Sequence, residues 1–397
     1  MKNISYRLKN MSFSKTLYMA NIARNLINKG YKNIINLGIG EPDFNPPGFI
    51  LHAAKKAIDD GYHKYSPISG YYDLRETICK KFKRDNGLNY NPSQIVVSTG
   101  VKQSIINVFL SILNSDDEVI IPAPYWVSYY EMVKLCEAKP VIIHTDRKTN
   151  FKVTAIQLEK SINSKTRAFI FSSPSNPSGC VYSKSELKSL AKILSKHQNI
   201  VIVSDEIYEH ICYISHASIA SITDVYGQTI TINGISKAFS MTGWRIGYIG
   251  APEWIAQACE KVQGQMTSGA NSISQRATIA ALAGSMKSMI VSLKKRRNLV
   301  LEFIDKIPGF QSNIPNGTFY VFPDVSNLLH RNISGTFIKN SDDLAMILLE
   351  KIKVLTIGGS SFGKEKHLRI SYAMSKSKLL EAFRRIKNLL YVNKLKK

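Results

Sequence analysis

The stretch from Gln94 to Gly250 alternates short apolar runs with longer, helix-prone segments. Such alternation is typical of parallel β-strands joined by crossover helices. The apolar runs predict seven strands of one sheet: Ile95–Ser98, Val119–Ile121, Val141–His144, Ala168–Ser172, Ile200–Ser204, Thr229–Asn233 and Gly247–Gly250. We therefore expect an α/β protein with a mostly parallel, seven-stranded sheet in a large domain.

A second region follows the long, proline-free and helix-prone stretch from Ile273 to Phe303. Its predicted elements are strands at Thr318–Phe322 and Leu368–Ser371 and helices at Asp342–Lys351 and Lys376–Leu390. Near the start of the chain, Leu17–Lys29 predicts an amphipathic helix in an N-terminal arm. We expect the large domain to cover residues 48–295, and the arm (1–47) to join a smaller α+β domain (296–397).

The formal net charge of +24 is the unusual bulk property of this chain. Its basic residues are spread along the whole length and do not gather in an arm interleaved with aromatic side chains, which argues against nucleic-acid binding. The densest cluster, Lys294-Lys295-Arg296-Arg297, is predicted to form a solvated helix face. No apolar run approaches the roughly 18 residues needed to cross a bilayer, so a membrane-spanning protein is not expected.

Five scattered cysteines, none in a CxxC pair, favour reduced thiols in the cytoplasm over disulfides or a zinc site. The eight histidines have no metal-ligand spacing either. Glu206 and His210 are four residues apart, which we interpret as one face of a helix. No bound metal is therefore expected.

Polar residues follow several predicted strands, where ligands of parallel α/β sheets bind. Gly100-Val101-Lys102 opens a helix after the first strand, and its free backbone N–H groups suit a phosphate. Asn176 lies in a turn after Ala168–Ser172, while Asp205 and Tyr208 follow Ile200–Ser204. Each of these signals is weak alone, since such residues more often have a structural role in a turn or a helix cap.

The strand Thr229–Asn233 is followed by Ser236-Lys237 and then by Thr242-Gly243-Trp244-Arg245-Ile246-Gly247-Tyr248. This combination resembles the lysine motif of class I aminotransferases, which bind pyridoxal 5'-phosphate (PLP). The resemblance continues in order through Asn36–Phe44, Lys64-Tyr65, Pro124-Tyr125-Trp126, the Asn176 turn, Asp205–Tyr208 and His367–Tyr372. It covers nearly the whole chain and implies the fold type I PLP-dependent family, with most similarity to bacterial aspartate aminotransferases of the subgroup that includes thermophilic enzymes.

The resemblance implies that Lys237 carries PLP covalently and then acts as the catalytic base, while Asp205 pairs with the ring nitrogen. Tyr208 and Asn176 would reach the phenolic oxygen, and Trp126 would stack on the ring. The residues implied at the phosphate are Gly100, Val101, Lys102, Ser236, Arg245 and, from a neighbouring subunit, Tyr65. A site shared in this way implies a homodimer.

Arg369 resembles the family residue that binds the substrate α-carboxylate, together with Gly40, Trp126 and Asn176. At the far end of the substrate, the resemblance implies Lys102, Ser14 and Thr16 as specificity residues. These imply L-aspartate and L-glutamate as amino donors, with oxaloacetate and 2-oxoglutarate as the 2-oxo acids. Some family members also accept prephenate through a basic residue early in the arm, where this chain has Ser12, with Lys15 nearby.

Alternative functions stay open at this point. An aromatic or prephenate aminotransferase, or a PLP-dependent carbon–sulfur lyase, would use the same Lys237 and Asp205. A non-catalytic, ligand-binding regulator with a basic DNA-binding surface is a different class, although no helix-turn-helix accompanies the aminotransferase-like sequence.

Overall fold

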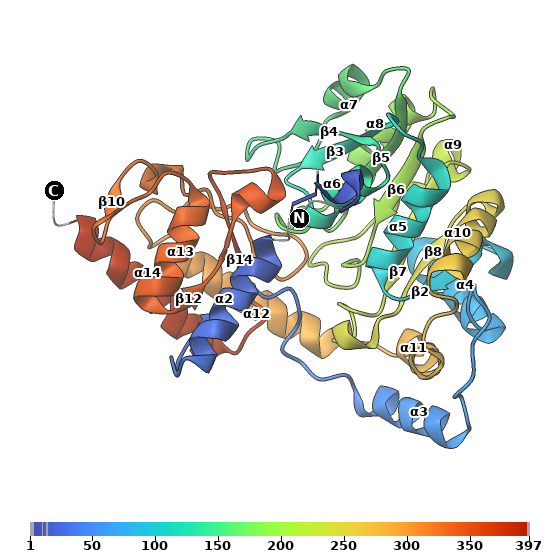
Figure 1. Cartoon of the computed structure of the whole chain (residues 1–397), viewed down its shortest axis with the longest axis horizontal. Coiled ribbons are helices and arrows are strands. Elements are labelled where there is room, and N and C mark those ends of the chain that lie inside the picture. The colour runs from blue at the N-terminus through green and yellow to red at the C-terminus, as the bar shows by residue number, and fades with distance from the viewer. Residues whose placement is uncertain (1–3, 10, 13–14, 395–397) are drawn as a thin grey trace.

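In the computed structural model, which describes residues 4–9, 11–12 and 15–394, seven strands form the central sheet of the larger of two lobes (Figure 1). Their order across the sheet is β2-β8-β7-β6-β5-β3-β4. The bounds are β2 Ile95–Ser98, β3 Glu118–Ala123, β4 Lys139–His144, β5 Thr166–Ser172, β6 Val201–Asp205, β7 Thr229–Gly234 and β8 Gly247–Gly250. All seven predicted strands are confirmed as members of this sheet.

Six of the strands run in one direction, and β8 alone is antiparallel to both of its neighbours. The carboxyl ends of the six parallel strands therefore lie at one edge of the sheet. Because β8 runs the other way, the residues just before Gly247 reach the same edge, beside Ser98 and Gly234. This arrangement places several predicted site residues next to one another.

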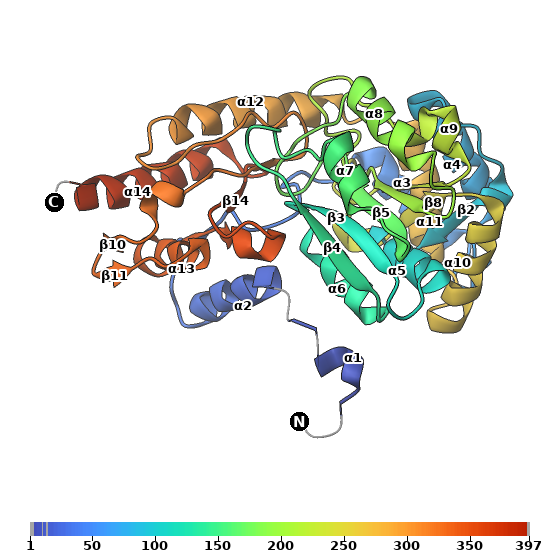
Figure 2. The same ribbon diagram turned by 90° about the horizontal axis from the view of Figure 1, so that it is seen from above.

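Alternate strand residues pack on opposite faces of the sheet, as expected for a sheet covered on both sides. Val119 and Ile121 belong to the core beneath α5, α6 and α10, whereas Ile120 belongs to the core beneath α7 and α8. At the β2 edge, α4 and α11 cover the second face. Figure 2 shows these helices as two layers around the strands.

Helices α5 to α10 each follow a strand of the large sheet along the chain, and some of them begin with a clear N-terminal cap. At α8, Ser183 accepts a hydrogen bond from the Glu186 N–H (3.2 Å), and the Glu186 carboxylate accepts from the Ser183 N–H (2.8 Å). This reciprocal pair is a capping box. The bounds are α3 Gly48–Asp59, α4 Tyr72–Asn86, α5 Val101–Ile112, α6 Val127–Leu135, α7 Ala155–Ser161, α8 Lys184–Leu194, α9 Thr223–Tyr226, α10 Glu253–Met266 and α11 Ser272–Ala283.

The smaller lobe has an antiparallel sheet of three strands in the order β13-β14-β9. Its predicted helices and strand β14 are confirmed, while the first predicted strand is shorter than expected. The bounds are α12 Lys287–Ile304, β9 Tyr320–Val321, β10 Asn332–Ile333, β11 Thr336–Phe337, α13 Ser341–Ile352, β12 Val354–Leu355, β13 Ile357–Gly358, β14 Leu368–Ser371 and α14 Lys376–Lys394. Figure 2 shows α12 extending between the two lobes, so the proposed boundary at residue 296 falls inside this helix.

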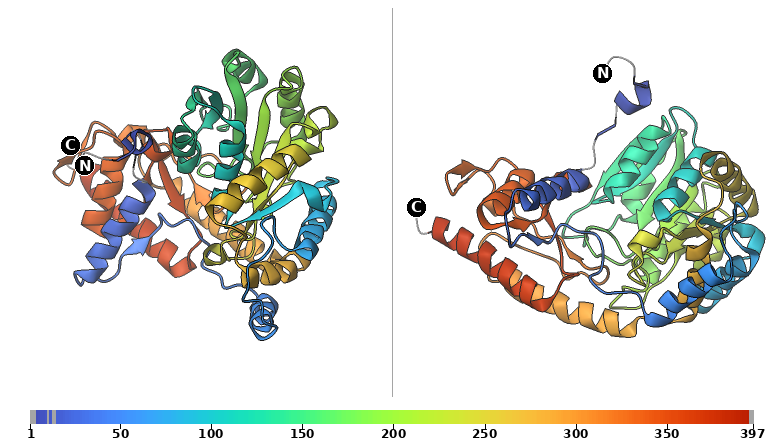
Figure 3. Two further views of the ribbon diagram at one scale, coloured as in Figure 1. Left: turned by 45° about the vertical axis from the view of Figure 1, so that its right-hand side comes forward. Right: turned by 60° about the horizontal axis from the view of Figure 1, so that its bottom comes forward.

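From residue 15 onward, the N-terminal arm packs on the smaller lobe. It comprises α1 (Tyr6–Lys9), α2 (Lys15–Asn28) and β1 (Ile35–Asn36). Strand β1 pairs in parallel with β12, and Figure 3 shows α2 lying against the smaller lobe while α1 extends away from it. The predicted amphipathic helix is thus present, and Met19 and Ala23 form its buried side.

The helix-prone stretch 273–303 is helical, but it is divided into two helices. Helix α11 ends at Ala283, and Gly284 has an extended conformation before α12 begins. A Cβ atom at Gly284 would lie 2.3 Å from the Phe49 ring of α3. The break is therefore fixed by tertiary packing between α3 and α11.

Two further predictions are corrected. Glu206 and His210 lie in a turn after β6, so they do not share a helix face. The basic cluster 294–297 is exposed only at its two lysines: Arg296 binds Asp43 (2.6 Å), and Arg297 is buried against the Pro315 carbonyl.

Across the described residues, each helix is either too short or too polar to span a lipid bilayer.

Candidate active site

A cavity of about 500 Å³ opens at the carboxyl ends of the parallel strands, between the larger lobe, the arm and the smaller lobe. Twelve of the predicted site residues line it together. They are Thr16, Gly40, Val101, Lys102, Trp126, Asn176, Asp205, Tyr208, Ser236, Lys237, Arg245 and Arg369. Residues from eight separate segments of the sequence are thus brought to one place.

Lys237 follows β7, and its side chain enters the cavity. Its Nζ donates a hydrogen bond to the carbonyl oxygen of Gly40 (2.6 Å). Burial lowers the pKa of Lys237 to about 8; the nearby Arg369 and Arg245 charges act in the same direction, and the carboxylates of Glu41 and Asp205 oppose them. An amine with this pKa is neutral, and hence nucleophilic, in about one molecule in ten at pH 7, which is far more than for an ordinary lysine.

Asp205 is the last residue of β6 and is buried. One carboxylate oxygen accepts a hydrogen bond from the Tyr129 hydroxyl (2.5 Å), and the other accepts from the Ile207 N–H (3.1 Å). Burial raises the pKa of Asp205 to about 6, although Tyr129, Ile207 and Lys237 all favour the charged form. A cation beside this carboxylate would stabilise its ionised state.

Tyr208 lies three residues beyond Asp205, in the turn that leaves the sheet. Its hydroxyl is 3.2 Å from the Tyr320 hydroxyl, and both rings are buried. Burial holds the pKa of Tyr208 well above its usual range, so the phenol is a hydrogen-bond donor and not a base at neutral pH.

The start of α5 has features that suit an anion. Gly100 precedes this helix with φ = 86°, and a Cβ atom there would lie 2.3 Å from a guanidinium nitrogen of Arg245. Only glycine allows both the backbone conformation and this close approach. The first N–H groups of α5 have no partners within the helix, and they lie beside Arg245, which suits a phosphate.

Arg369, on β14, also lines the cavity and is buried. Its terminal nitrogens donate to the Asn176 side-chain oxygen (3.1 Å) and to the Gly38 carbonyl (2.7 Å). Its Nε has no hydrogen-bond partner, and no carboxylate of the described chain forms an ion pair with this guanidinium. A buried cation with an orphaned donor suits a carboxylate ligand.

The distal residues of the predicted substrate site have different outcomes. Lys102 lines the cavity with its Nζ 5.2 Å from the centre of the Trp126 ring, and burial lowers its pKa. Thr16 also lines the cavity, whereas Ser14 lies outside the described residues. Tyr65, expected from a neighbouring subunit, is 95% exposed and does not line the cavity of its own chain.

Neither residue considered for prephenate lines the cavity. The Ser12 N–H donates to the Glu131 carboxylate (3.1 Å), and Lys15 Nζ binds Asp342 (2.8 Å) and the Ser360 hydroxyl (2.8 Å). Among the described residues of the arm, Arg24, farther along α2, is the basic residue that does line it.

Sequence reasoning missed Tyr129 and Tyr320, which hydrogen-bond to Asp205 and Tyr208. A signal existed for Tyr129, because it is three residues beyond Trp126 and therefore one helical turn away on α6. No local signal could place Tyr320, since it comes from the smaller lobe.

Several known proteins resemble this chain. Residues 32–386 match the family model for aminotransferase class I and II. A bifunctional aspartate aminotransferase and glutamate/aspartate-prephenate aminotransferase from Petunia hybrida is 43% identical over 397 residues, covering 98% of this chain and 83% of that protein.

Two solved structures have the same fold over nearly their whole length. The aspartate aminotransferase of Rhizobium meliloti has a TM-score of 0.95 at 39% identity, covering 98% of this chain and 99% of that one. The aspartate aminotransferase of Thermus thermophilus with maleate has a TM-score of 0.91 at 35% identity, covering 98% and 100%. By sequence and by fold, this chain belongs to the class I and II aminotransferase family.

Proposed function

We propose that the enzyme is an aspartate aminotransferase that binds PLP through Lys237 and exchanges amino groups between L-aspartate or L-glutamate and oxaloacetate or 2-oxoglutarate. The observation that carries this proposal is that one cavity is lined by groups suited to the cofactor and by a group suited to the substrate carboxylate. An amine with a lowered pKa, a buried carboxylate and a buried guanidinium with an unpartnered Nε line this one cavity. The aspartate aminotransferase names of the relatives agree with it.

The residues present fit PLP group by group. The start of α5 with Arg245 and Ser236 suits the phosphate, and Asp205 suits a protonated ring nitrogen. Asn176 and Tyr208 supply donors for a phenolic oxygen, and Trp126 offers a ring face for stacking. When bound, PLP supplies an aldehyde for an amine and a ring that accepts electrons.

Each protein group then has a defined task. Arg369 binds the α-carboxylate through two parallel charge-assisted hydrogen bonds, which fixes the direction of the substrate Cα–H bond. When its bond to the cofactor has been exchanged for that of the substrate amine, the neutral amine of Lys237 would take the proton from that Cα. The Asp205 carboxylate would keep the ring nitrogen of the cofactor protonated, and the Tyr129 hydroxyl holds this carboxylate in place.

The substrate class rests on the cationic lining of the cavity. Lys102 lies against Trp126 and lines the cavity wall, where it would pair with a distal carboxylate, and Thr16 borders the same space. Ser14 is kept in this proposal as a further specificity residue. Dicarboxylic substrates satisfy both Arg369 and Lys102 at once.

Prephenate is a second candidate substrate, because the Petunia relative carries that activity in its name. The arm side of the cavity has an apolar wall suited to a ring. Its residues are Leu17, Ala20, Ile27 and Ile34.

A half-reaction screen tests the substrate class. Individual amino acids are mixed with the PLP-loaded protein, and the loss of visible absorbance is recorded. L-aspartate and L-glutamate are expected to convert the cofactor fastest. Faster conversion by aromatic amino acids would reassign the substrate, and release of pyruvate and ammonia without any 2-oxo acid would indicate a lyase.

We further propose that two chains share each active site and that Tyr65 of a second copy contacts the phosphate. Its 95% exposure leaves it available for such a contact.

We also propose that the chain is divided into two domains, with boundaries at residues 47/48 and 295/296. The five free cysteines suit a reducing compartment, so we propose that the protein is located in the cytoplasm.

The pH dependence of PLP capture is expected to report the pKa of Lys237. Only the neutral amine attacks an aldehyde, so the second-order rate for the cofactor-free protein should rise about tenfold per pH unit below 8. Above that pH the rate should level off. Stopped-flow absorbance between pH 6.5 and 10 measures it; a rate that still climbs steeply from pH 8 to 10 would indicate an ordinary lysine.

Tyr129→Phe is expected to lower kcat about tenfold or more, because a hydrogen bond to a charged group contributes roughly 1.5–3 kcal/mol. Without the hydroxyl, the pKa of Asp205 rises above its value of about 6, and less carboxylate is ionised at neutral pH. The activity should therefore recover partly as the pH increases. Tyr130→Phe is the matched control, because Tyr130 is the next residue along the chain and its ring stacks on that of Tyr125. This variant should keep its kcat.

A further inference from the structure

The turn that carries Asp205 and Tyr208 has a second, buried side that the proposed chemistry does not use. Asp205, Ile207 and Tyr208 line the cavity, whereas Glu206, Glu209 and their partners do not. Glu209 is 6% exposed, and its partner Lys81, on α4, is 1% exposed. A pair of opposite charges buried to this degree is uncommon and calls for a reason.

The contacts around Glu209 tie the turn to α4. One carboxylate oxygen forms an ion pair with Lys81 Nζ, and the other accepts a hydrogen bond from the Asn86 amide (2.8 Å). Lys81 Nζ also donates to the Asn86 side-chain oxygen (2.8 Å), which closes a three-membered network. Its members all come from α4 except Glu209.

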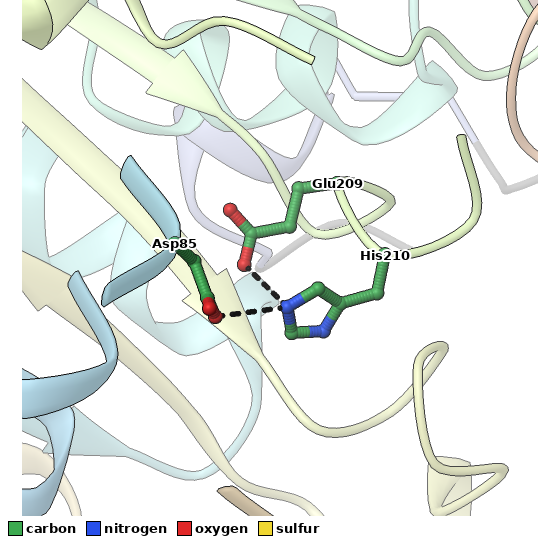
Figure 4. A group of neighbouring side chains, drawn as sticks. All are labelled: Asp85, Glu209 and His210. Atoms are coloured by element: carbon green, nitrogen blue, oxygen red, sulfur yellow. Dashed lines mark hydrogen bonds and ion pairs between the residues drawn. The ribbon is translucent and has the colours of Figure 1, made fainter. Parts of the chain in front are cut away.

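His210 extends this network, as Figure 4 shows. Its Nε2 lies 3.3 Å from a Glu209 oxygen and 3.1 Å from an Asp85 oxygen. Burial would raise the pKa of Glu209, but the charges of Lys81, His210 and His216 outweigh it and lower the pKa to about 2. Glu209 is therefore ionised throughout the working range of pH.

A metal site is the less favoured interpretation of these residues. Two groups have the spacing of metal ligands, Asp85 with Glu209 and His210, and Glu206 with Glu209 and His216. Both depend on Glu209, whose oxygen is already bound by the Lys81 ammonium. Lys81 thus takes the place that a cation would occupy.

The backbone of the turn links this network to the cavity. Tyr208 and Glu209 are consecutive, with one side chain at the cavity and the other at α4. The Glu209 N–H donates to the Glu206 carbonyl (2.9 Å), and the Ile211 N–H donates to the Tyr208 carbonyl (2.8 Å). Fixing Glu209 therefore restrains the backbone on which Tyr208 is carried.

We propose that Lys81 and Glu209 are positioning residues, whose ion pair holds the turn so that the Tyr208 hydroxyl faces the phenolic oxygen of the cofactor. This inference rests on the proposed function, because it concerns a contact with PLP. It assigns a role in the reaction to a charge pair on the opposite side of the turn from the substrate.

The pKa of the visible chromophore formed between the cofactor and Lys237 is the readout. A hydroxyl that donates to the phenolic oxygen stabilises its negative charge and so lowers this pKa. Glu209→Gln keeps the side-chain volume but removes the charge that binds Lys81. We expect it to raise the chromophore pKa by at least about half a unit, a roughly threefold change in the proton equilibrium.

A double-mutant cycle separates positioning from general disturbance. If Glu209 acts through the Tyr208 hydroxyl, Glu209→Gln should have almost no further effect in a Tyr208→Phe background. Glu159→Gln removes an exposed ion pair with Lys196 and is the matched control, with no expected shift. Far-ultraviolet circular dichroism and thermal unfolding establish that each variant is folded.

Breaking a buried ion pair can unfold a protein, whereas replacing both partners by apolar residues is often tolerated. The double variant Lys81→Met with Glu209→Met is therefore the second test, and it should raise the chromophore pKa in the same way. An unchanged pKa in either folded variant, an equal shift without the Tyr208 hydroxyl, or a failure of both variants to fold would overturn the proposal. Absence of any chromophore in the unmodified protein would instead overturn the proposed function.

Discussion

Lys237→Ala is expected to abolish the visible absorbance of the PLP-loaded protein and to lower transamination by at least about four orders of magnitude. The variant loses the amine that would bind the cofactor and also the base that moves the substrate proton, and positioned bases alone contribute about 10²–10⁴-fold. Absorbance spectra after gel filtration and a coupled assay with L-aspartate and 2-oxoglutarate measure the two losses.

Lys102→Ala is the matched control for this result, because Lys102 is the other lysine among the described residues that line the cavity. It should keep the visible absorbance while its KM for L-aspartate rises. Retention of both the chromophore and the activity by Lys237→Ala would show that another residue binds the cofactor.

Arg369→Ala is expected to raise the KM for L-aspartate at least about tenfold, since each charge-assisted hydrogen bond contributes roughly 1.5–3 kcal/mol. Arg369→Lys should recover little of this loss, because an ammonium cannot form two parallel bonds to one carboxylate. Steady-state kinetics with both substrates varied give the constants.

Arg297→Lys is a suitable control for the loss of a buried guanidinium. Arg297 is also buried, donates to the Pro315 carbonyl and lies over the Tyr213 ring, but it does not line the cavity. Its KM for L-aspartate should stay near that of the unmodified protein. An unchanged KM in Arg369→Ala would remove this residue from the substrate site.

The fold could be predicted from the sequence wherever the local apolar pattern agrees with the burial that tertiary packing requires. Strands β2, β8 and β14 begin and end where their apolar runs predict, because each run is buried on both faces. The fold type I architecture also follows from the motif resemblance, and the similarity to solved aminotransferases confirms it.

The fold departs from the local sequence pattern where distant contacts decide the backbone conformation. Gly284 ends α11 because Phe49 of α3 packs against it, and a lone glycine does not predict such a break. The spacing of Glu206 and His210 matches a helix, yet these residues form a turn whose conformation is set by partners on α4 and beyond β6.

The candidate site shows the same division. Lys237, Asp205 and Arg369 could be found because each follows or lies within a recognisable strand motif. Tyr320 could not, since only the packing of the smaller lobe brings its hydroxyl to Tyr208. Lys81 had no signal either, because a lysine in a polar helix is ordinarily expected to be exposed.

The central claim is that the Lys237 amine holds the cofactor. Borohydride reduction of the PLP-loaded protein, followed by proteolysis and mass spectrometry, tests it most directly, because reduction makes the lysine–cofactor bond permanent. We predict a single phosphopyridoxyl group on the peptide that contains Lys237. A label on Lys102 or on any other lysine, with Lys237 unmodified, would contradict the account.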